Sequence, residues 1–319
     1  MEKNGCPVEP LAIGIEIGGT KIQVGLGSPS GKLLPEGILQ RRVVHENGAK
    51  GIRDDLFSMT EEILETKGLK LADICKIGIG FGGIVGTNSG VILKSYQIDG
   101  WDNFPLQKWA ENQWGKPVCI QNDASAAGLA ESLHGSGWGY SRIFYITLGS
   151  GIGGGWILDG KIDDGQGYGA AEIGHTWVPD PTSGTPVELE QICSGWSIGR
   201  RARSAASNKH TLMTELAGSI DRIDAKVVYS AAEKGDEIAN HILIETCQTL
   251  GLTISNVVAL LHPERVILGG GVSLMGPLFW NTLRKEARSR MMPYFASQVD
   301  IVGAKLKENV VVIGALCLD

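Results

Sequence analysis

Residues 13–26 have the sequence IGIEIGGTKIQVGL, and residues 145–158 have the sequence YITLGSGIGGGWIL. Each stretch predicts an apolar strand, a glycine-rich turn and a returning strand, and the two lie about 130 residues apart, roughly one domain length. Tight hairpins alone would account for the glycines. Because both turns also carry hydroxyls (Thr20; Thr147 and Ser150), the pattern favours two phosphate-facing hairpins, one in each of two domains.

Short buried strands and amphipathic helices alternate along the rest of the chain, which predicts an α/β fold built in layers. The expected strands are 11–17, 22–26, 77–81, 118–121, 142–148, 156–158 and 265–268. The expected helices are 53–64, 106–114, 122–133 and 237–261, with a further one after Pro277.

The composition limits the class of protein. A length of 319 residues predicts two domains at roughly 150 residues each, and a net charge of -6 argues against a nucleic-acid-binding face. The six cysteines are widely spaced and form no CxxC pair, as expected for reduced thiols in a cytoplasmic protein. The first ten residues predict a loose leader without signal-peptide character, and we find no apolar run near 18 residues, so we expect no membrane partner.

The second hairpin matches GxGxxG at Gly149, Gly151 and Gly154, which is the dinucleotide fingerprint. That fingerprint requires a helix directly after the glycines, whereas residues 156–158 predict a strand. A GxxxxGK[ST] phosphate loop is missing from the sequence as well. The glycines are therefore expected to bind phosphate through converging backbone N–H groups, and an NAD-dependent oxidoreductase remains a minor alternative.

The first hairpin adds charge to its turn. A carboxylate beside phosphates needs an intervening cation, so Glu16 is a candidate for organising Mg²⁺ through water. Thr20 and Lys21 are candidates for contacts with terminal phosphate oxygens. The alternative is that Glu16 and Lys21 are ordinary solvated turn residues.

Two further groups suit a polyhydroxylated substrate. Asn122 and Asp123 follow a strand and open a helix; Asp123 is either an N-cap or, at the carboxyl edge of the sheet, the base that accepts a hydroxyl proton. Glu172, His175 and Glu190 supply acceptors and an imidazole for sugar hydroxyls, although they could also be scattered loop residues.

Taken together, these motifs resemble the ROK family of sugar kinases and related repressors. The resemblance runs from about Ile13 to the C-terminus and is carried by seven segments in the family's order: IGIEIGGTK, GIGFGGIVG, NDASAAGLAE, TLGSGIGGG, AAEIGHTWV, LEQICSG and HPERVILGGGV.

The resemblance implies an actin-like ATPase (ribonuclease H-like) fold with two domains and an interdomain cleft. We expect a small lobe of residues 1–121, with residues 309–319 packing on it, and a large lobe of residues 122–308. The implied activity is ATP- and Mg²⁺-dependent phosphorylation of a hexose, most simply glucose, by a cytoplasmic homodimer.

The resemblance also assigns site residues by position. Asp123 is the implied catalytic base. The implied sugar contacts are Gly83, Asn122, Asp123, Glu172, His175 and Glu190. The implied ATP contacts are Gly18, Gly19, Thr20 and Lys21 on one side, Thr147, Gly149, Ser150, Gly151 and Gly153 on the other, and Gly270 and Gly271 beside the adenosine.

Three departures from the family pattern matter. Glu16 stands where the family has Asp, which puts the Mg²⁺ contact in doubt, and Gly82-Gly83 stands where many members have Pro-Gly. Members typically have a zinc site of one histidine and three cysteines before the downstream glutamate, but residues 176–189 (TWVPDPTSGTPVEL) contain no cysteine. We therefore predict no zinc, with His175 serving the sugar alone.

Several alternatives remain open in the sequence. The substrate could be fructose, mannose or an N-acetylhexosamine, and the donor could be ATP or polyphosphate. A non-catalytic sugar-binding protein is a second class. Only about a dozen residues precede the first strand, too few for the DNA-binding module of the family's repressors, so the kinase branch is favoured.

Overall fold

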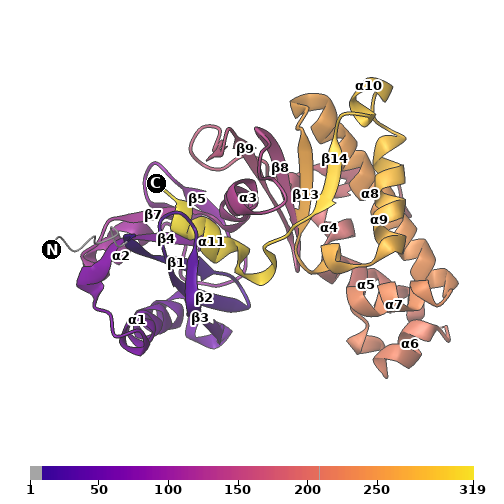
Figure 1. Ribbon diagram of the computed structural model, residues 1–319. Helices are drawn as coiled ribbons and strands as arrows, with labels where there is room; N and C mark the ends of the chain where they lie inside the picture. Colours follow the sequence, from indigo (N-terminus) through magenta and orange to yellow (C-terminus); the bar gives the residue numbers. More distant parts are fainter. Residues whose placement is uncertain (1–8, 208) are drawn as a thin grey trace. The chain divides into compact units, whose positions relative to one another are not determined.

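The computed structural model describes residues 9–207 and 209–319, which form two compact units (Figure 1). Of the described residues, unit 1 comprises those up to Trp138 together with Gly160–Ala170 and Glu308–Asp319, and unit 2 comprises those of Gly139–Asp159 and Ala171–Lys307. Most of the expected leader, residues 1–8, lies outside the described residues. The division differs from the expected boundary at residue 121, because the helix that begins at Asp123 belongs to unit 1.

Unit 1 is built on a mixed five-stranded sheet with the order β3-β2-β1-β4-β7. Its elements are β1 (Leu11–Ile17), β2 (Lys21–Gly27), β3 (Leu33–Arg42), α1 (Gly48–Thr66), β4 (Ile74–Phe81), β5 (Ile84–Gly86), β6 (Val91–Lys94), α2 (Leu106–Trp114), β7 (Val118–Asn122), α3 (Asp123–His134), β10 (Lys161–Ile162) and α11 (Val310–Cys317). β1, β4 and β7 run parallel, and Ile17, Phe81 and Asn122 are in register at their ends. Three predicted site segments therefore leave the sheet at the same edge.

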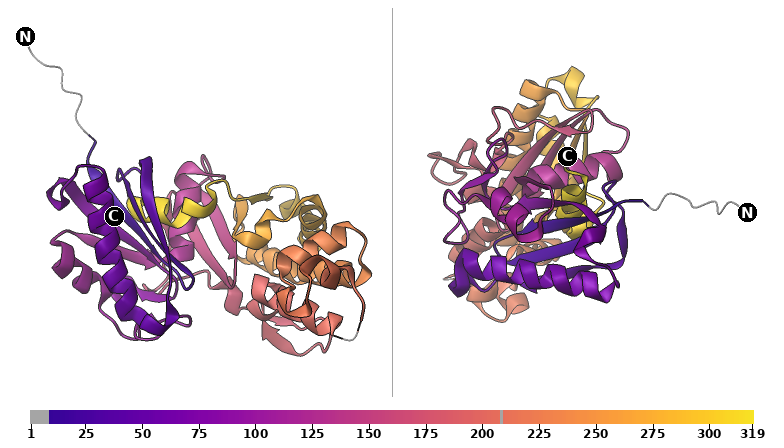
Figure 2. Two further views of the ribbon diagram at one scale, coloured as in Figure 1. Left: turned by 90° about the horizontal axis from the view of Figure 1, so that it is seen from below. Right: turned by 90° about the vertical axis from the view of Figure 1, so that its left-hand side faces the viewer.

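The two faces of this sheet are covered differently (Figure 2). Isoleucines of β1 point into a core that they share with α1, including Leu56 and Met59. Glycines line the opposite face: a Cβ added at Gly14 or Gly78 would lie 2.4 or 1.7 Å from a backbone oxygen of α11. The glycines thus let the C-terminal helix, yellow in Figure 1, lie directly on the N-terminal strands.

Close backbone contact also explains why α3 belongs to unit 1. A Cβ added at Gly314 of α11 would lie 1.9 Å from the carbonyl oxygen of Ala126 in α3. The two helices can approach this closely only because position 314 carries no side chain. The non-local packing of α11 on α3 moves the boundary of unit 1 beyond residue 121.

Unit 2 contains a second sheet in which β9, β8, β13 and β14 follow one another. Its elements are β8 (Arg142–Leu148), β9 (Ile152–Leu158), η3 (Ile173–His175), β11 (Trp177–Pro179), β12 (Pro186–Glu188), α4 (Glu190–Cys193), α5 (Gly195–Ala206), α6 (Leu212–Ala217), α7 (Ala225–Glu233), α8 (Glu237–Leu261), β13 (Arg265–Gly269), η5 (Gly271–Leu274), α9 (Pro277–Arg288), α10 (Pro293–Ala296) and β14 (Asp300–Gly303). β8 and β13 are parallel, with Thr147 opposite Gly269. The second glycine hairpin and the Gly269–Gly271 turn therefore share one edge of this sheet.

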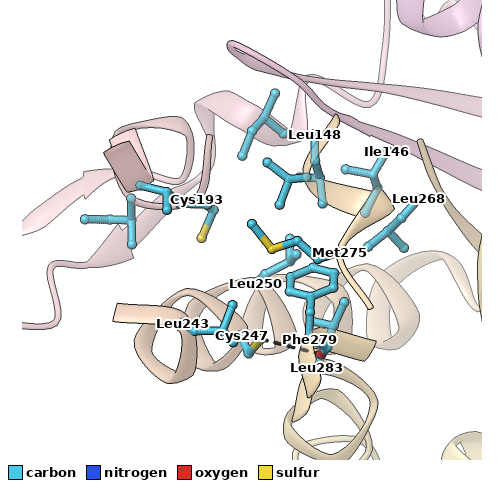
Figure 3. Close-up of a cluster of buried hydrophobic side chains, with 14 of the residues drawn as sticks. Ile146, Leu148, Cys193, Leu243, Cys247, Leu250, Leu268, Met275, Phe279 and Leu283 are labelled. Carbon is cyan, nitrogen blue, oxygen red and sulfur yellow. Dashed lines mark hydrogen bonds between the residues drawn. The ribbon is translucent and has the colours of Figure 1, made fainter. Parts of the chain in front are cut away.

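The core of unit 2 joins this sheet to its longest helix. Figure 3 shows side chains of β8, β13, α8 and α9, among them Leu148, Leu268, Leu250 and Phe279, in one buried cluster. α8 is long and apolar enough by length and composition to span a membrane. Because 61% of its most apolar window is buried inside the protein, the same character is accounted for by core packing.

Candidate functional site

Asp123 lies at the carboxyl edge of the unit 1 sheet, beside the first glycine hairpin. A Cβ added at Gly82 would lie 3.2 Å from Asp123 Oδ2 and 3.4 Å from the carbonyl oxygen of Ile17. The other carboxylate oxygen, Oδ1, accepts a hydrogen bond from the Ala124 backbone N–H at 2.7 Å. The structure therefore brings the predicted base and the turn that follows Ile17 close together.

Asn122 is the residue that caps α3. Its Oδ1 accepts from the N–H groups of Ala124 and Ser125 at 2.9 and 3.1 Å, and its Nδ2 donates to the carbonyl oxygen of Gly83 at 3.1 Å. The interpretation of Asp123 as the N-cap is thus wrong, because Asn122 is the N-cap of α3. Asn122 also ties the Gly82-Gly83 turn to the start of α3, which leaves one amide hydrogen of Nδ2 for a substrate.

The sequence analysis missed a pair that fixes the end of β7. Gln121 Nε2 donates to both carboxylate oxygens of Asp164, at 3.0 and 2.8 Å, and Gln121 Oε1 accepts from the Asn122 backbone N–H at 2.6 Å. Asp164 lies in the Gly160–Ala170 segment of unit 1, and Gly167 in the same segment accepts from the Thr87 N–H at 3.1 Å. A separation of 43 residues gives no local signal for this contact.

The charged residues of the first hairpin bind each other. Glu16 is only 8% exposed, and its Oε2 lies 3.2 Å from Lys21 Nζ, which also donates to Gln23 Oε1 at 3.0 Å. Burial raises the pKa of Glu16, and the nearby Lys21 ammonium opposes that shift. Glu16 is therefore no solvated turn residue, whereas Thr20 at the tip of the turn is exposed.

The second hairpin is a strand hairpin, as the sequence predicts. β9 starts at Ile152 and pairs antiparallel with β8, with Thr147 opposite Gly153, and the expected start at residue 156 is too late. The chain after Gly154 continues as this strand, so the helix that a dinucleotide fingerprint needs is not there. The structure excludes the NAD-dependent alternative on this motif.

Two glycines of unit 2 have no structural reason to lack a side chain. A Cβ added at Gly149 would meet only the carbonyl oxygen of Gly151, at 3.9 Å, and a Cβ added at Gly271 would meet nothing within 4 Å. Neither residue has the positive φ that favours glycine, in contrast to Gly270 at 79°. Open space above a bare backbone is what the close approach of a ligand requires.

Glu190 connects the predicted sugar site of unit 2 to this hairpin. Its Oε2 accepts from the Ile152 backbone N–H at 2.7 Å, and a Cβ added at Gly151 would lie 2.5 Å from the same oxygen. The Gly195 N–H donates to the Gly149 carbonyl oxygen at 2.8 Å, which anchors the other side of the turn. Ser150 at the tip is exposed.

Glu172 and His175 lie on the turn that leads through η3 into β11. Gly174 permits a tight fit against β9, since a Cβ there would lie 2.2 Å from the Ile152 carbonyl oxygen. Although Glu172 as a residue is exposed, partial removal of its carboxyl group from water raises its pKa. The charges of His175 and Glu190 act on the same carboxyl group, in opposite directions, so the three predicted residues form one electrostatic cluster.

The residues of this cluster do not form a metal centre. In the described part of the chain, no group of three or more His, Cys, Asp or Glu side chains is arranged to hold a metal ion. His175 Nδ1 instead lies 3.2 Å from Glu188 Oε1, a residue that the sequence analysis did not single out.

The predicted residues thus fall into two groups, each described within its own unit. In unit 1 the structure brings together Glu16, Gly18, Gly19, Thr20, Lys21, Gly82, Gly83, Asn122 and Asp123. In unit 2 it brings together Thr147, Gly149, Ser150, Gly151, Gly153, Glu172, His175, Glu190, Gly270 and Gly271.

Two α/β units, each with a glycine hairpin at one sheet edge, define the class of actin-like ATPases, and comparison with known proteins supports this fold. The structure resembles a ROK family glucokinase from Streptomyces griseus, solved with glucose and AMPPNP, with a TM-score of 0.80 and 31% identity over 96% of this chain and 98% of that one. The ROK family profile matches residues 12–319. The chain belongs to the ROK family.

Curated relatives include both branches of the family. A glucokinase from Thermotoga maritima is 34% identical over 308 residues, which is 95% of each chain. A xylose repressor from Caldicellulosiruptor bescii is 28% identical over 96% of this chain but only 77% of its own length. Relatives with kinase names and relatives with repressor names thus share the region that this chain matches.

Proposed function

We propose that this chain, a sugar kinase of the ROK family, transfers a phosphoryl group from ATP to a hexose hydroxyl, with glucose as the preferred acceptor and glucose 6-phosphate as the product. The observation that carries the proposal is Asp123: its carboxylate lies at the carboxyl edge of the sheet and is relieved of capping by Asn122. The similarity to glucokinases over nearly the whole chain supports the same assignment.

In the proposed reaction, Asp123 accepts the proton of the sugar hydroxyl while the hydroxyl oxygen bonds to the γ-phosphorus of ATP. The bond between the γ-phosphorus and the bridging oxygen breaks, and ADP leaves with the electron pair of that bond. Asn122, Glu172, His175 and Glu190 hold the other hydroxyls. The backbone N–H groups of the glycine turns bind phosphate oxygens. Gly271 leaves room for the adenosine, and Gly270 beside it packs on the backbone of Leu148.

Mg²⁺ would neutralise charge on the transferring phosphates. Glu16 fits this ion only through water, because its Oε2 is already 3.2 Å from the Lys21 ammonium. Lys21 itself is held by Glu16 and Gln23, so its proposed contact with phosphate requires a change of partner.

A coupled assay over a panel of hexoses tests the proposal. Glucose, mannose, fructose and N-acetylhexosamines are offered with ATP or polyphosphate, and ADP and sugar phosphate are measured. We expect ATP-dependent glucose 6-phosphate formation with the highest kcat/KM. If a sugar binds but no sugar of the panel is phosphorylated, the result would instead indicate the second candidate, a sugar-binding regulator. The similarity to the xylose repressor favours this second candidate.

We further propose that the protein is a cytoplasmic homodimer. The five described cysteines are free, and burial raises the pKa of Cys193 to about 12, as suits inert reduced thiols in the cytoplasm.

Light scattering coupled to size-exclusion chromatography tests the oligomeric state, because it measures the mass of the species in solution directly. A single species near twice the chain mass of 34.0 kDa supports the dimer, and a species near that mass contradicts it.

A further inference from the structure

The loop that lacks cysteines, residues 176–189, has an ordered conformation of its own. It forms an antiparallel hairpin of β11 and β12, with Trp177 opposite Glu188, and the Leu189 N–H donates to the Thr176 carbonyl oxygen at 2.9 Å. β11 begins two residues after His175, and β12 ends two residues before Glu190. The two ends of the hairpin are therefore near two of the proposed sugar contacts.

A carboxylate orders the tip of this hairpin. Asp180 Oδ1 accepts from the N–H groups of Thr182 and Ser183 at 2.9 and 2.8 Å, and the Asp180 N–H donates to the Thr185 carbonyl oxygen at 2.8 Å. The hydrogen bonds to its carboxylate, led by the one from the Ser183 N–H, hold the pKa of Asp180 below its ordinary value. The tip is thus closed by hydrogen bonds that need no metal.

A second carboxylate lies at the base of the hairpin. Glu188 Oε1 is 3.2 Å from His175 Nδ1. An ionised carboxylate can only accept, so Nδ1 must carry the proton of this hydrogen bond. In a neutral imidazole, a proton on Nδ1 makes Nε2 the acceptor.

We infer that Glu188 is the positioning residue for His175: it sets the tautomer and the ring orientation with which Nε2 meets a sugar hydroxyl. Glu188 does this from the base of a hairpin whose tip Asp180 closes. The inference rests on the proposed function for the identity of the ligand, whereas the tautomer of His175 is a property of the chain alone.

The first measurement concerns the tautomer. Proton–nitrogen correlation spectra of ¹⁵N-histidine-labelled protein at pH 8, where an ordinary imidazole is neutral, give the protonated nitrogen of each ring. His175→Asn identifies the His175 signals. We expect an Nδ1-protonated ring in the wild type and in Glu188→Gln, and a shift towards Nε2 protonation in Glu188→Ala. An Nε2-protonated wild type, or a tautomer unchanged in Glu188→Ala, would overturn the inference.

The second measurement separates binding from chemistry. Glu188→Ala is expected to raise the KM for glucose about tenfold with little change in kcat, because one hydrogen bond to a charged group is lost. Glu188→Gln is expected to keep most of the affinity, since its amide oxygen accepts the same hydrogen bond. An unchanged KM for Glu188→Ala, or an equal loss in Glu188→Gln, would contradict the positioning role.

A matched control is available in the same unit. Glu215 lies 3.3 Å from His210 Nε2, in an exposed pair outside the proposed site. Glu215→Ala is expected to leave the kinetics and the His175 signals unchanged. If Glu188→Ala fails to fold, the wild-type tautomer and Glu188→Gln still decide the question.

Metal dependence gives the last comparison. Protein stripped with a chelator and returned to Mg²⁺ is expected to regain its activity, with about 0.1 zinc or less per chain, since closed zinc sites need a full set of ligands. Activity that returns only with zinc would overturn the inference. If the wild type phosphorylates no sugar, the proposed function fails, but the His175 tautomer still tests the role of Glu188.

Discussion

The two glycine hairpins have similar sequences but different supports. In the first, the side chains of Glu16 and Lys21 bind each other, and the Gln97 side chain lies over Gly19, where an added Cβ would be 1.6 Å from its Oε1. In the second hairpin, a Cβ added at Gly149 would meet only the carbonyl oxygen of Gly151, at 3.9 Å. The first turn therefore combines charge with a side-chain cover over Gly19, whereas the second is covered by Glu190 at Gly151 and open at Gly149.

This difference shows how one pattern serves two purposes. Glycines that are close to other atoms of the chain, such as Gly154 against the Ala171 carbonyl oxygen, are needed for the fold. Glycines that face open space, such as Gly149, leave room for the close approach of a ligand. Substitutions at the two kinds of position should separate stability from ATP binding.

Among the hairpin variants, Gly149→Val is expected to have the largest effect on function. The new side chain would find room in the protein, so the thermal midpoint should stay within a few degrees. It would occupy the space proposed for phosphates, and we expect kcat/KM for ATP to fall by about 100-fold, equivalent to about 2.7 kcal/mol. Gly149→Ala should give a smaller loss, and ATP kinetics unchanged in both variants would remove Gly149 from the site.

Gly154→Ala is expected to show the opposite behaviour. Its Cβ would lie 2.2 Å from the Ala171 carbonyl oxygen, a backbone atom that cannot rotate away. We expect a loss of about 2–3 kcal/mol in the free energy of unfolding, as for overpacked cores. The matched test compares denaturant unfolding of Gly154→Ala with that of Gly149→Ala. Equal stability of the two variants would contradict the distinction between glycines needed for the fold and glycines that leave room for a ligand.

Lys21→Met tests the charged support of the first hairpin. Removal of the ammonium leaves the buried Glu16 carboxylate without its partner, and we expect a loss of about 1–2 kcal/mol at pH 8. Lys21→Met in a Glu16→Gln background should cost much less, since no buried charge then remains. Similar losses in both backgrounds would show that the pair does not support the turn.

The pH dependence of stability gives the smallest effect. Because the folded pKa of Glu16 is raised above 4.5, its contribution is most favourable below that pH and is lost as the pH rises through the folded pKa. Lys21→Met should steepen this fall and Glu16→Gln should abolish it. Unfolding curves measured from pH 4 upwards check the sign, and a contribution from Glu16 that grows with pH would contradict it.

Local pattern was sufficient for the elements that surround the site. The strands ending at Ile17, Phe81 and Leu148 and the helices of residues 106–114 and 237–261 follow from periodicity and turn residues. The position of Asp123 after a strand also placed it at the sheet edge. These features depend on neighbours in sequence, which a single chain displays.

Contacts between distant residues could not be predicted in the same way. The hydrogen bonds of Gln121 to Asp164 and of His175 to Glu188 join residues 43 and 13 positions apart. Neither separation follows from the local periodicity of a helix or a strand. The boundary of unit 1 was missed for the same reason, since Gly314 meets Ala126 only in the folded protein. In the sequence, Gly314 is only a small residue in an apolar helix, and its contact with Ala126 becomes evident only in the structure.

The most direct test of the account is the turnover of Asp123→Asn. If Asp123 takes the hydroxyl proton, this variant should bind glucose with nearly unchanged affinity by calorimetry and form glucose 6-phosphate at least 1,000-fold more slowly, a loss of about 4 kcal/mol of transition-state stabilisation. Turnover within about tenfold of the wild type, a difference of only about 1.4 kcal/mol, would contradict the assignment of the base.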